Sequence, residues 1–316
     1  MKSIGIDIGG TFIKFILVNQ KKEVLKSTQI ATSVKLTKRA FISQLAGVVK
    51  EWQKDFKKEK AVIGIGIAGD TDNIKGILHF APNIPWHNFK ITELLTKETG
   101  LKSYACNDAN MAAWGIYDYE FKRKYKNFMA ITLGTGVGGG IILDGKLFQG
   151  FSGSAGEFGH IKIDYSKEAF ECGCGHKGCL EAYIGTKGLK RQMQEAAKKE
   201  PKSILAKLLK EEDFSVKMLS VAASKGDKNA LAIWQNFGRS LGRALSDVVL
   251  LLNPQAIALA GGVSKGSKYF MPALKEVFSK QAIKRPFKDL KILVSKEKNI
   301  GALGAALYAL SKENEK

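Results

Sequence analysis

Three cysteines and a histidine lie close together in the segment 152–181. Cys172, Cys174 and Cys179 form a Cys-x-Cys-x4-Cys pattern, and His160 precedes it. Three thiolates and one imidazole match the ligand types and ligand number of a closed structural zinc site. A disulfide would leave one of the three cysteines unpaired, so a metal is favoured. We therefore predict Zn²⁺ on these four side chains. Buried free thiols, a redox pair and an ordinary core histidine remain the alternatives.

Two glutamates flank the predicted metal ligands and are not needed to complete the metal site. Glu157 and Glu181 are therefore available to a substrate. A sugar has several ring hydroxyls, which carboxylate, amide and imidazole groups can bind through hydrogen bonds. A histidine that holds a metal through one ring nitrogen can present the other nitrogen to a hydroxyl. The residues with this sugar-binding chemistry are Asn83, Asn107, Glu157, His160 and Glu181.

Glycine-rich turns follow three of the predicted strands. Glycine allows positive φ, and a turn of this kind can point backbone N–H groups into a cavity and bind an anion. The turns are Gly9-Gly10-Thr11, Gly134-Thr135-Gly136 and Gly261-Gly262. The second turn also matches the dinucleotide-binding fingerprint by its letters, but a strand and not a helix is predicted after it, which excludes that function. We interpret the three turns as phosphate-binding elements.

Two aspartates lie at strand ends where they could assist phosphoryl transfer. Asp7 lies beside the first glycine turn, and a carboxylate there would suit a magnesium ion that also contacts phosphate oxygens. Capping of the turn is the alternative for Asp7. Lys14 could offset phosphate charge. Asp108 fits the general base that accepts a proton from the hydroxyl being phosphorylated. Helix capping by the Asn107-Asp108 pair is the alternative there.

Strands and helices alternate along the chain, which indicates an α/β fold. Period-2 and uniformly apolar runs predict strands, and apolar spacing of three to four residues predicts helices. The predicted strands are 3–8, 12–18, 23–31, 61–68, 102–106, 128–133, 139–143, 256–260 and 290–295. The predicted helices are 41–56, 91–98, 188–198, 203–209, 216–223, 228–252, 269–280 and 300–310, and one further helix is capped by Asn107-Asp108-Ala109-Asn110.

A weak internal repeat relates two strand–turn–strand segments. Residues 6–19 align with residues 131–144 with the glycine turns in register, and Asp7 of the first copy corresponds to Thr132 of the second. The chain length of 316 residues suits about two domains. We expect a smaller α/β domain at 1–118 plus 300–316, and a larger α/β domain with the cysteine cluster at 119–299.

The composition narrows the classes of partner. Lys and Arg number 50 against 30 Asp and Glu, a formal net charge of +20. The basic residues are dispersed and form no Arg-rich stripe, so we do not expect nucleic-acid binding. The longest apolar run, 248–263, is interrupted by Asn253-Pro254 and is too short for a membrane span. Reduced cysteines and a start without an export signal predict a cytoplasmic protein.

Taken as a set, the motifs resemble the ROK (repressor, open reading frame, kinase) family. They are Asp7-Ile-Gly-Gly-Thr11, Gly66-Ile-Ala-Gly69, Pro82-Asn83, Asn107-Asp108-Ala-Asn110, Leu133-Gly-Thr-Gly-Val-Gly-Gly139, Ala155-Gly-Glu-Phe-Gly-His160 and Cys172-Gly-Cys-Gly-His-Lys-Gly-Cys-Leu-Glu181. The resemblance extends from Asp7 to Gly262. Repressor members carry a helix-turn-helix ahead of the first motif, whose strand begins here at residue 3, so DNA binding is not expected.

The resemblance implies two ribonuclease-H-like domains of the actin/Hsp70/sugar-kinase type around a cleft. It implies an ATP-dependent hexose kinase that acts on the 6-hydroxyl of a sugar, glucose first, with Asp108 as the base and as a sugar contact. ATP phosphates would meet Gly9, Gly10 and Thr11, and also Gly134, Thr135 and Gly136. Adenosine would lie near Gly261 and Gly262. The expected cofactors are ATP, Mg²⁺ and Zn²⁺, and we expect a homodimer.

Other functions remain open at this stage. Within the same family, N-acetylglucosamine, N-acetylmannosamine or fructose could replace glucose, and inorganic polyphosphate could replace ATP. From a different class, the chain could be a catalytically silent sugar-sensing protein. A sensor would not require both Asp108 and the glycine turns, so we favour the kinase.

Overall fold

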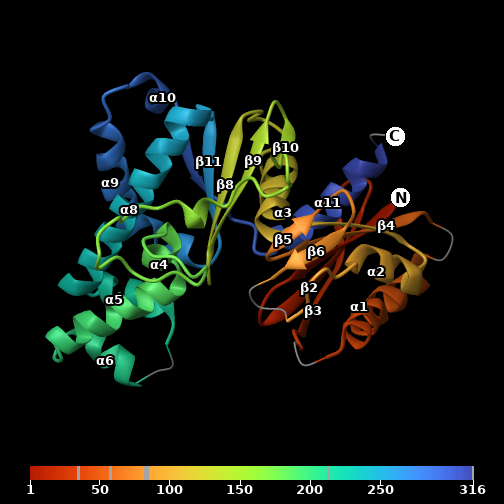
Figure 1. Cartoon of the computed structure of the whole chain (residues 1–316), viewed down its shortest axis with the longest axis horizontal. Helices are drawn as coiled ribbons and strands as arrows, with labels where there is room; N and C mark the ends of the chain where they lie inside the picture. Colours follow the sequence, from red (N-terminus) through yellow and green to blue (C-terminus); the bar gives the residue numbers. More distant parts are fainter. Residues whose placement is uncertain (34–35, 57–58, 82–84, 212–213, 315–316) are drawn as a thin grey trace. The chain divides into compact units, whose positions relative to one another are not determined.

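The computed structural model describes the chain except residues 34–35, 57–58, 82–84, 212–213 and 315–316. Two compact units account for it (Figure 1). Unit 1 comprises Met1–Ala130, Gly140–Gly156 and Glu297–Lys316, and unit 2 comprises Ile131–Gly139 and Glu157–Lys296. The domain boundaries expected from the sequence, 1–118 plus 300–316 and 119–299, stay a prediction.

The sheet of unit 1 has the strand order β3-β2-β1-β4-β7. β1 pairs antiparallel with β2 and parallel with β4, so the sheet changes direction at its central strand. The apolar faces of β1 and β4 are buried throughout, as expected for strands covered on both sides. The bounds are β1 Lys2–Ile8, β2 Phe12–Asn19, β3 Val24–Ala31, β4 Ala61–Ile67 and β7 Lys102–Asn107.

Helices cover both faces of this sheet (Figure 1). Helix α11 lies unusually close to it, because a Cβ at Gly5 or Gly64 would overlap a backbone carbonyl of α11. The Ser3 hydroxyl also donates a hydrogen bond of 2.8 Å to the Ala306 carbonyl. The elements are α1 Lys38–Gln53, α2 Ile91–Thr99, α3 Asp108–Gly115, α11 Ile300–Asn314, a 3-10 turn Lys54–Phe56, a π-helical turn Ile116–Glu120 and a hairpin of β5 Asp70–Asp72 and β6 Ile77–Phe80.

The second sheet has the strand order β10-β9-β8-β11-β12. Read by position, this order matches the first sheet, with β8, β9 and β10 in the places of β1, β2 and β3. The predicted repeat, 6–19 against 131–144, therefore falls on equivalent strand–turn–strand segments. The bounds are β8 Phe128–Leu133, β9 Val137–Leu143, β10 Lys146–Phe148, β11 Ala256–Ala260 and β12 Lys291–Val294.

Helices make up most of unit 2. Helix α8 is the longest of those described and ends where Asn253 adopts a left-handed conformation, with φ of 43°, just before Pro254. It packs tightly on α9, because a Cβ at Gly238 would overlap the Phe270 carbonyl oxygen. The elements are α4 Leu180–Ile184, α5 Thr186–Lys199, α6 Ile204–Glu211, α7 Val216–Ser224, α8 Lys228–Leu252, α9 Ser267–Ser279, α10 Arg285–Lys288 and two 3-10 turns, Phe158–His160 and Val263–Gly266.

The predicted α/β class is confirmed, and each predicted strand and helix has a counterpart. The sequence analysis missed the β5–β6 hairpin, β10 and the short helices α4 and α10.

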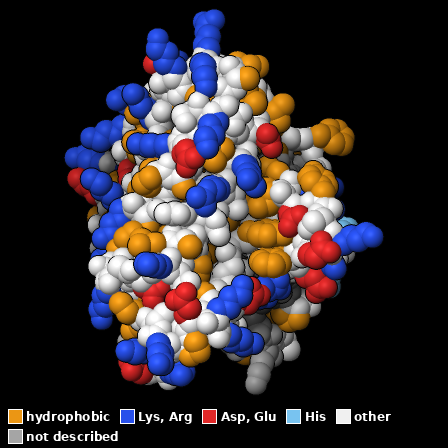
Figure 2. All heavy atoms as spheres, turned by 90° about the vertical axis from the view of Figure 1, so that its left-hand side faces the viewer, with side chains coloured by type: hydrophobic (Ala, Val, Ile, Leu, Met, Phe, Trp, Pro, Cys, Tyr) orange, Lys and Arg blue, Asp and Glu red, His pale blue; other side chains and the backbone are white. Residues whose placement is uncertain are grey.

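Lys and Arg side chains are dispersed over the face shown in Figure 2, with Asp and Glu among them. Among the described residues, no helix is both long and apolar enough to cross a membrane.

The close contact between α11 and the first sheet leads to a stability prediction. Gly64→Ala places a methyl group on the Ala305 carbonyl oxygen, and relieving the overlap should cost about 1–3 kcal/mol or more. Gly47→Ala is the matched control, because Gly47 lies in α1 with no neighbour within 4 Å of the added Cβ. That change should be neutral or stabilising by up to about 1 kcal/mol. Urea unfolding measures both, and equal stabilities for the two variants would refute the contact.

Candidate active site and metal centre

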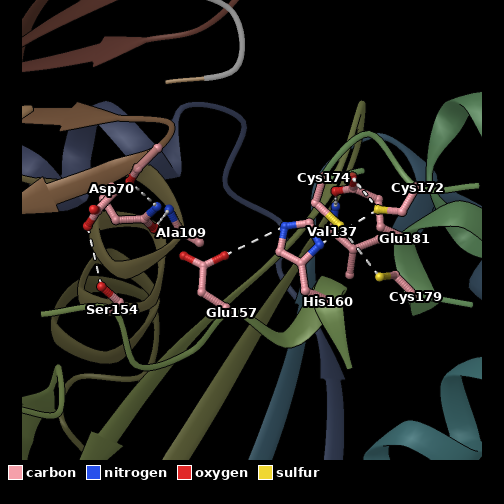
Figure 3. A network of polar contacts seen from close by, with 12 residues as sticks. Asp70, Ala109, Val137, Ser154, Glu157, His160, Cys172, Cys174, Cys179 and Glu181 are labelled. Carbon is pink, nitrogen blue, oxygen red and sulfur yellow. Dashed lines mark hydrogen bonds and ion pairs between the residues drawn. The ribbon is translucent and has the colours of Figure 1, made fainter. Parts of the chain in front are cut away.

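The predicted metal ligands converge in unit 2. His160 Nδ1 lies 3.7 Å from Cys172 Sγ, and the Cys174 and Cys179 sulfurs lie 3.7 Å apart. One ligand atom from each of these residues lies within 4.8 Å of the others (Figure 3). Four ligands at the zinc–sulfur distance of about 2.3 Å in a tetrahedron would be about 3.8 Å apart. The donor set and its spacing therefore fit a tetrahedral zinc ion.

Glycines between the cysteines give the loop its tight path. Gly175 and Gly178 have φ of 85° and 82°, a region that residues with a side chain rarely adopt. The loop is closed by a 2.7 Å hydrogen bond from the Cys172 amide to the His176 carbonyl. A Cβ at Gly178 would also overlap the Asp164 carbonyl oxygen. These glycines therefore allow the tight loop in which the three sulfurs come together.

His160 presents its two ring nitrogens to different partners. Nδ1 faces Cys172, while Nε2 lies 3.9 Å from the Glu157 carboxylate (Figure 3). Both residues belong to the 3-10 turn Phe158–His160 or cap it, which fixes their relative position. If a metal holds Nδ1, the remaining nitrogen and Glu157 are directed toward the same region. This arrangement suits the predicted sugar contacts of Glu157 and His160.

Glu181 makes a contact that the sequence analysis did not predict. Its Oε2 accepts a 2.9 Å hydrogen bond from the Val137 amide, the first amide after the Gly134-Thr135-Gly136 turn. Its Oε1 lies 3.9 Å from Cys172 Sγ. The carboxylate therefore lies beside both the cysteine cluster and a predicted phosphate turn. The contact joins residues 44 positions apart, which no local pattern could reveal.

Only part of the glycine turns use the positive φ that glycine permits. Gly261 has φ of 92°, whereas Gly9, Gly134 and Gly136 do not have positive φ. Packing explains two of these glycines instead. A Cβ at Gly9 would lie 3.0 Å from the Phe12 carbonyl oxygen, and a Cβ at Gly136 would overlap Glu181 Oε2.

Packing does not explain why Gly134 and Gly262 are glycines. A Cβ at either position would have no neighbour within 4 Å. Neither residue has positive φ. Glycine at an open position with ordinary φ leaves the backbone free for close approach by a ligand. Both positions belong to turns that were expected to bind ATP.

Asp108, the predicted base, and Asp7, the predicted magnesium-side carboxylate, lie in unit 1. Asp7 pairs with Lys14 across β1 and β2, and its Oδ2 would lie 2.8 Å from a Cβ at Gly301, at the start of α11. Burial raises the pKa of Asp7 from 3.8 to about 6, with a further contribution from the Asp108 charge and an opposing one from Lys14. Burial also raises the pKa of Asp108, against the effect of the Ala109 amide. The two carboxyl groups are therefore close enough to influence each other.

Asn107 ends β7 and caps α3. Its side-chain oxygen accepts from the Ala109 and Asn110 amides at 2.9 and 3.3 Å, and its Nδ2 donates to the Gly69 carbonyl. The capping alternative is confirmed for this residue. One amide hydrogen is left for a ligand. Asn110, which the sequence analysis did not select, is buried with no hydrogen-bond partner for its Oδ1.

The predicted site residues divide between the units. Unit 1 carries Asp7, Gly9, Gly10, Thr11, Lys14, Asn107 and Asp108. Unit 2 carries Gly134, Thr135, Gly136, Glu157, His160, Cys172, Cys174, Cys179, Glu181, Gly261 and Gly262. Asn83, another predicted sugar contact, lies outside the described residues.

The raised pKa of Asp7 predicts a pH-dependent cost to stability. A carboxyl group with a higher pKa in the folded state binds protons more tightly there, so stability falls as pH rises from about 3.8 to about 6. The cost is absent below this range and complete above it. In metal-free protein, Asp7→Asn should therefore raise Tm by about 2–4 °C at pH 7.5 and change it little at pH 4. Thermal unfolding across this range measures the effect.

Asp144→Asn is the matched control for this prediction, because Asp144 is exposed and asparagine tolerates its φ of 48°. It should leave the pH dependence of Tm unchanged. An Asp7→Asn variant with the same Tm as the wild type at both pH values would contradict the assignment.

Comparisons with known proteins agree with these features. The ROK family model matches residues 3–312. The chain is 34% identical over 278 residues to glucokinase from Thermotoga maritima, covering 87% of this chain and 86% of the relative. It is 32% identical over 311 residues to glucokinase from Streptomyces coelicolor, covering 96% of each.

A solved structure shows the same likeness in three dimensions. The ROK family glucokinase from Streptomyces griseus, crystallised with glucose and AMPPNP, has a TM-score of 0.83 and 32% identity, covering 98% of this chain and 100% of that one. This likeness supports the expected sugar-kinase type of fold. Because the family model, the relatives and the fold agree over nearly the whole length, the chain belongs to the ROK family.

Proposed function

We propose that this protein is an ATP-dependent glucose kinase that transfers the γ-phosphoryl group of ATP to the 6-hydroxyl of the sugar. The observation that carries the proposal is the likeness, over 98% of the chain, to a glucokinase crystallised with glucose and AMPPNP. Relatives named glucokinase at 34% and 32% identity support the same activity. The geometry of the predicted site residues is compatible with it in each unit.

Asp108 is proposed as the general base. It lies at the first position of α3, and its 2.9 Å hydrogen bond with the Ala109 amide is to the local backbone. A carboxylate can accept about four hydrogen bonds, so capacity remains for a substrate hydroxyl. Burial raises its pKa toward the working pH, which strengthens it as a proton acceptor. Asn107, Glu157, His160 and Glu181, with Asn83, are proposed to bind the sugar.

The glycine turns are proposed to bind ATP. Gly134 and Gly262 have open space where a side chain would be, so phosphate or adenosine could approach their backbone. Mg²⁺, when bound with ATP, neutralises charge on the phosphate oxygens. Asp7 is proposed to hold a water of that ion, and Lys14 to offset further phosphate charge. Asp7 suits this role because Lys14 alone would compensate the charge of its half-buried carboxylate only in part.

The cysteine cluster is proposed to bind a structural zinc ion. Four protein ligands leave no open position for a catalytic water. The ion would fix the ring of His160 and the loop that leads to Glu181. A cytoplasmic location, a place in glucose metabolism by glycolysis and a homodimeric state complete the proposal.

Replacement of the base tests the activity directly. Asp108→Asn keeps the shape of the side chain but removes its ability to take the proton, so kcat should fall by about 10²–10⁴-fold. The assay couples ADP release to a panel of glucose, fructose, N-acetylglucosamine and N-acetylmannosamine. Glucose binding by the variant, followed by calorimetry, should persist. More than about a tenth of the wild-type kcat in the variant would remove Asp108 from the mechanism.

Metal analysis tests the proposed zinc site. The purified protein should contain about one zinc ion per chain, and Cys174→Ala should release it. Cys106→Ala is the matched control, because Cys106 is buried in unit 1 and lies outside the cluster. It should keep the full zinc content. A wild-type protein that is isolated without metal and keeps its activity in strong chelator would refute the site.

A further inference from the structure

The Gly134-Thr135-Gly136 turn, called here the phosphate turn, is held by residues that follow the cysteine cluster in the sequence. At one end, the Val137 amide donates its hydrogen bond to Glu181 Oε2 at 2.9 Å. At the other end, the Gly134 carbonyl accepts from both the amide and the hydroxyl of Thr186, at 3.2 and 2.8 Å. Both ends of the turn are therefore fastened to the short segment 181–186.

The carboxylate of Glu181 also packs against the turn. A Cβ at Gly136 would lie 2.4 Å from Glu181 Oε2, so a side chain at this position would displace the glutamate carboxylate. On its other side, a Cβ at Gly185 would lie 3.2 Å from Glu181 Cγ and 3.3 Å from the Thr135 carbonyl oxygen. Two glycines thus make room for one glutamate. Its position is determined by steric contact as well as by the hydrogen bond.

The same segment begins at the metal cluster. Cys179 is the residue that precedes α4, and Glu181 is the second residue of that helix. Glu181 Oε1 lies 3.9 Å from Cys172 Sγ (Figure 3). The cluster therefore lies directly before α4, and α4 carries the Glu181 carboxylate that meets the phosphate turn.

We propose that Glu181 is a positioning residue for the phosphate turn, through which the Cys/His cluster fixes the backbone that binds ATP. This inference rests on the proposed function, because it takes the turn to bind phosphate and the cluster to bind a metal. It adds to Glu181 a function toward the nucleotide, beside its proposed contact with the sugar. Removing the carboxylate should weaken nucleotide binding even when no sugar is present.

Two substitutions separate this function from the sugar contact. Glu181→Ala removes the acceptor for the Val137 amide, whereas Glu181→Gln keeps a side-chain oxygen of the same reach without the charge. Titration calorimetry with AMPPNP and Mg²⁺, on the metal-loaded full chain without sugar, gives the nucleotide Kd. We expect Glu181→Ala to raise Kd by about tenfold, as for the loss of one hydrogen bond. Glu181→Gln should stay within about threefold of the wild type.

Glu195→Ala is the matched control, because Glu195 is an exposed residue of α5 in the same unit. It should leave Kd unchanged. A tenfold loss in Glu181→Gln as well as in Glu181→Ala would assign the effect to charge and overturn the positioning function.

Hydrogen exchange at the Val137 amide gives a readout that does not depend on nucleotide binding. Exchange should be faster in Glu181→Ala and in wild-type protein treated with chelator, and it should remain slow in Glu181→Gln. Chelator should increase the exchange rate of the Glu181→Ala variant only slightly, because both changes release the same contact. If Glu181→Ala fails to fold, the wild type with and without chelator still decides whether the cluster holds the turn.

The outcomes distinguish the inference from the proposed function. Wild-type Kd in Glu181→Ala, with unchanged exchange at Val137, would overturn the inference and leave the kinase proposal intact. A wild-type protein that does not bind AMPPNP would instead remove the proposed function. Exchange at Val137 that is insensitive to chelator would disconnect the cluster from the turn.

Discussion

Unit 1 depends on how closely its last helix approaches the sheet and α3. Gly5 and Gly64 on the strands, and Gly304 and Gly115 on the facing helices, lie where any side chain would meet backbone. Such close packing leaves no room for adjustment, since protein interiors are as dense as organic crystals. The contact fixes the start of α11 against Asp7 and fixes the helix that begins with Asp108. Backbone packing thus determines the positions of the proposed base Asp108 and of the proposed magnesium-side carboxylate Asp7.

Much of this architecture could be predicted because its signals are local. The apolar periods determine helices and strands within a few residues, and Asn253-Pro254 marks the end of α8. Cysteine spacing was enough to predict the cluster, because metal geometry restricts which side chains can share an ion. The β5–β6 hairpin and β10 were missed because such short strands carry too few residues to show a period.

The candidate site shows more clearly what could not be predicted from the sequence. The sequence indicated Glu181 as a polar residue near the metal ligands, but its partner is a backbone amide on a distant strand. The same long-range contact explains Gly136, because the Glu181 carboxylate packs against it. Glycine can be favoured by a positive φ, by a neighbour that packs against it or by the approach of a ligand. Only the fold distinguishes these three reasons. Gly261 has positive φ, Gly136 has Glu181 packed against it, and Gly134 has open space that a ligand could approach.

The position of α11 in the sequence has a consequence for synthesis of the chain on the ribosome. Strands β1 to β7 and helix α3 emerge early, yet the helix that packs against β1, β4 and α3 is made after all of unit 2. At about 5–20 residues per second, roughly 10–40 s separate α3 from α11. During that interval the side of the first sheet that α11 covers is exposed, and its apolar side chains can contact other chains. All of unit 2 is made before α11, so unit 2 can complete its core before unit 1 does.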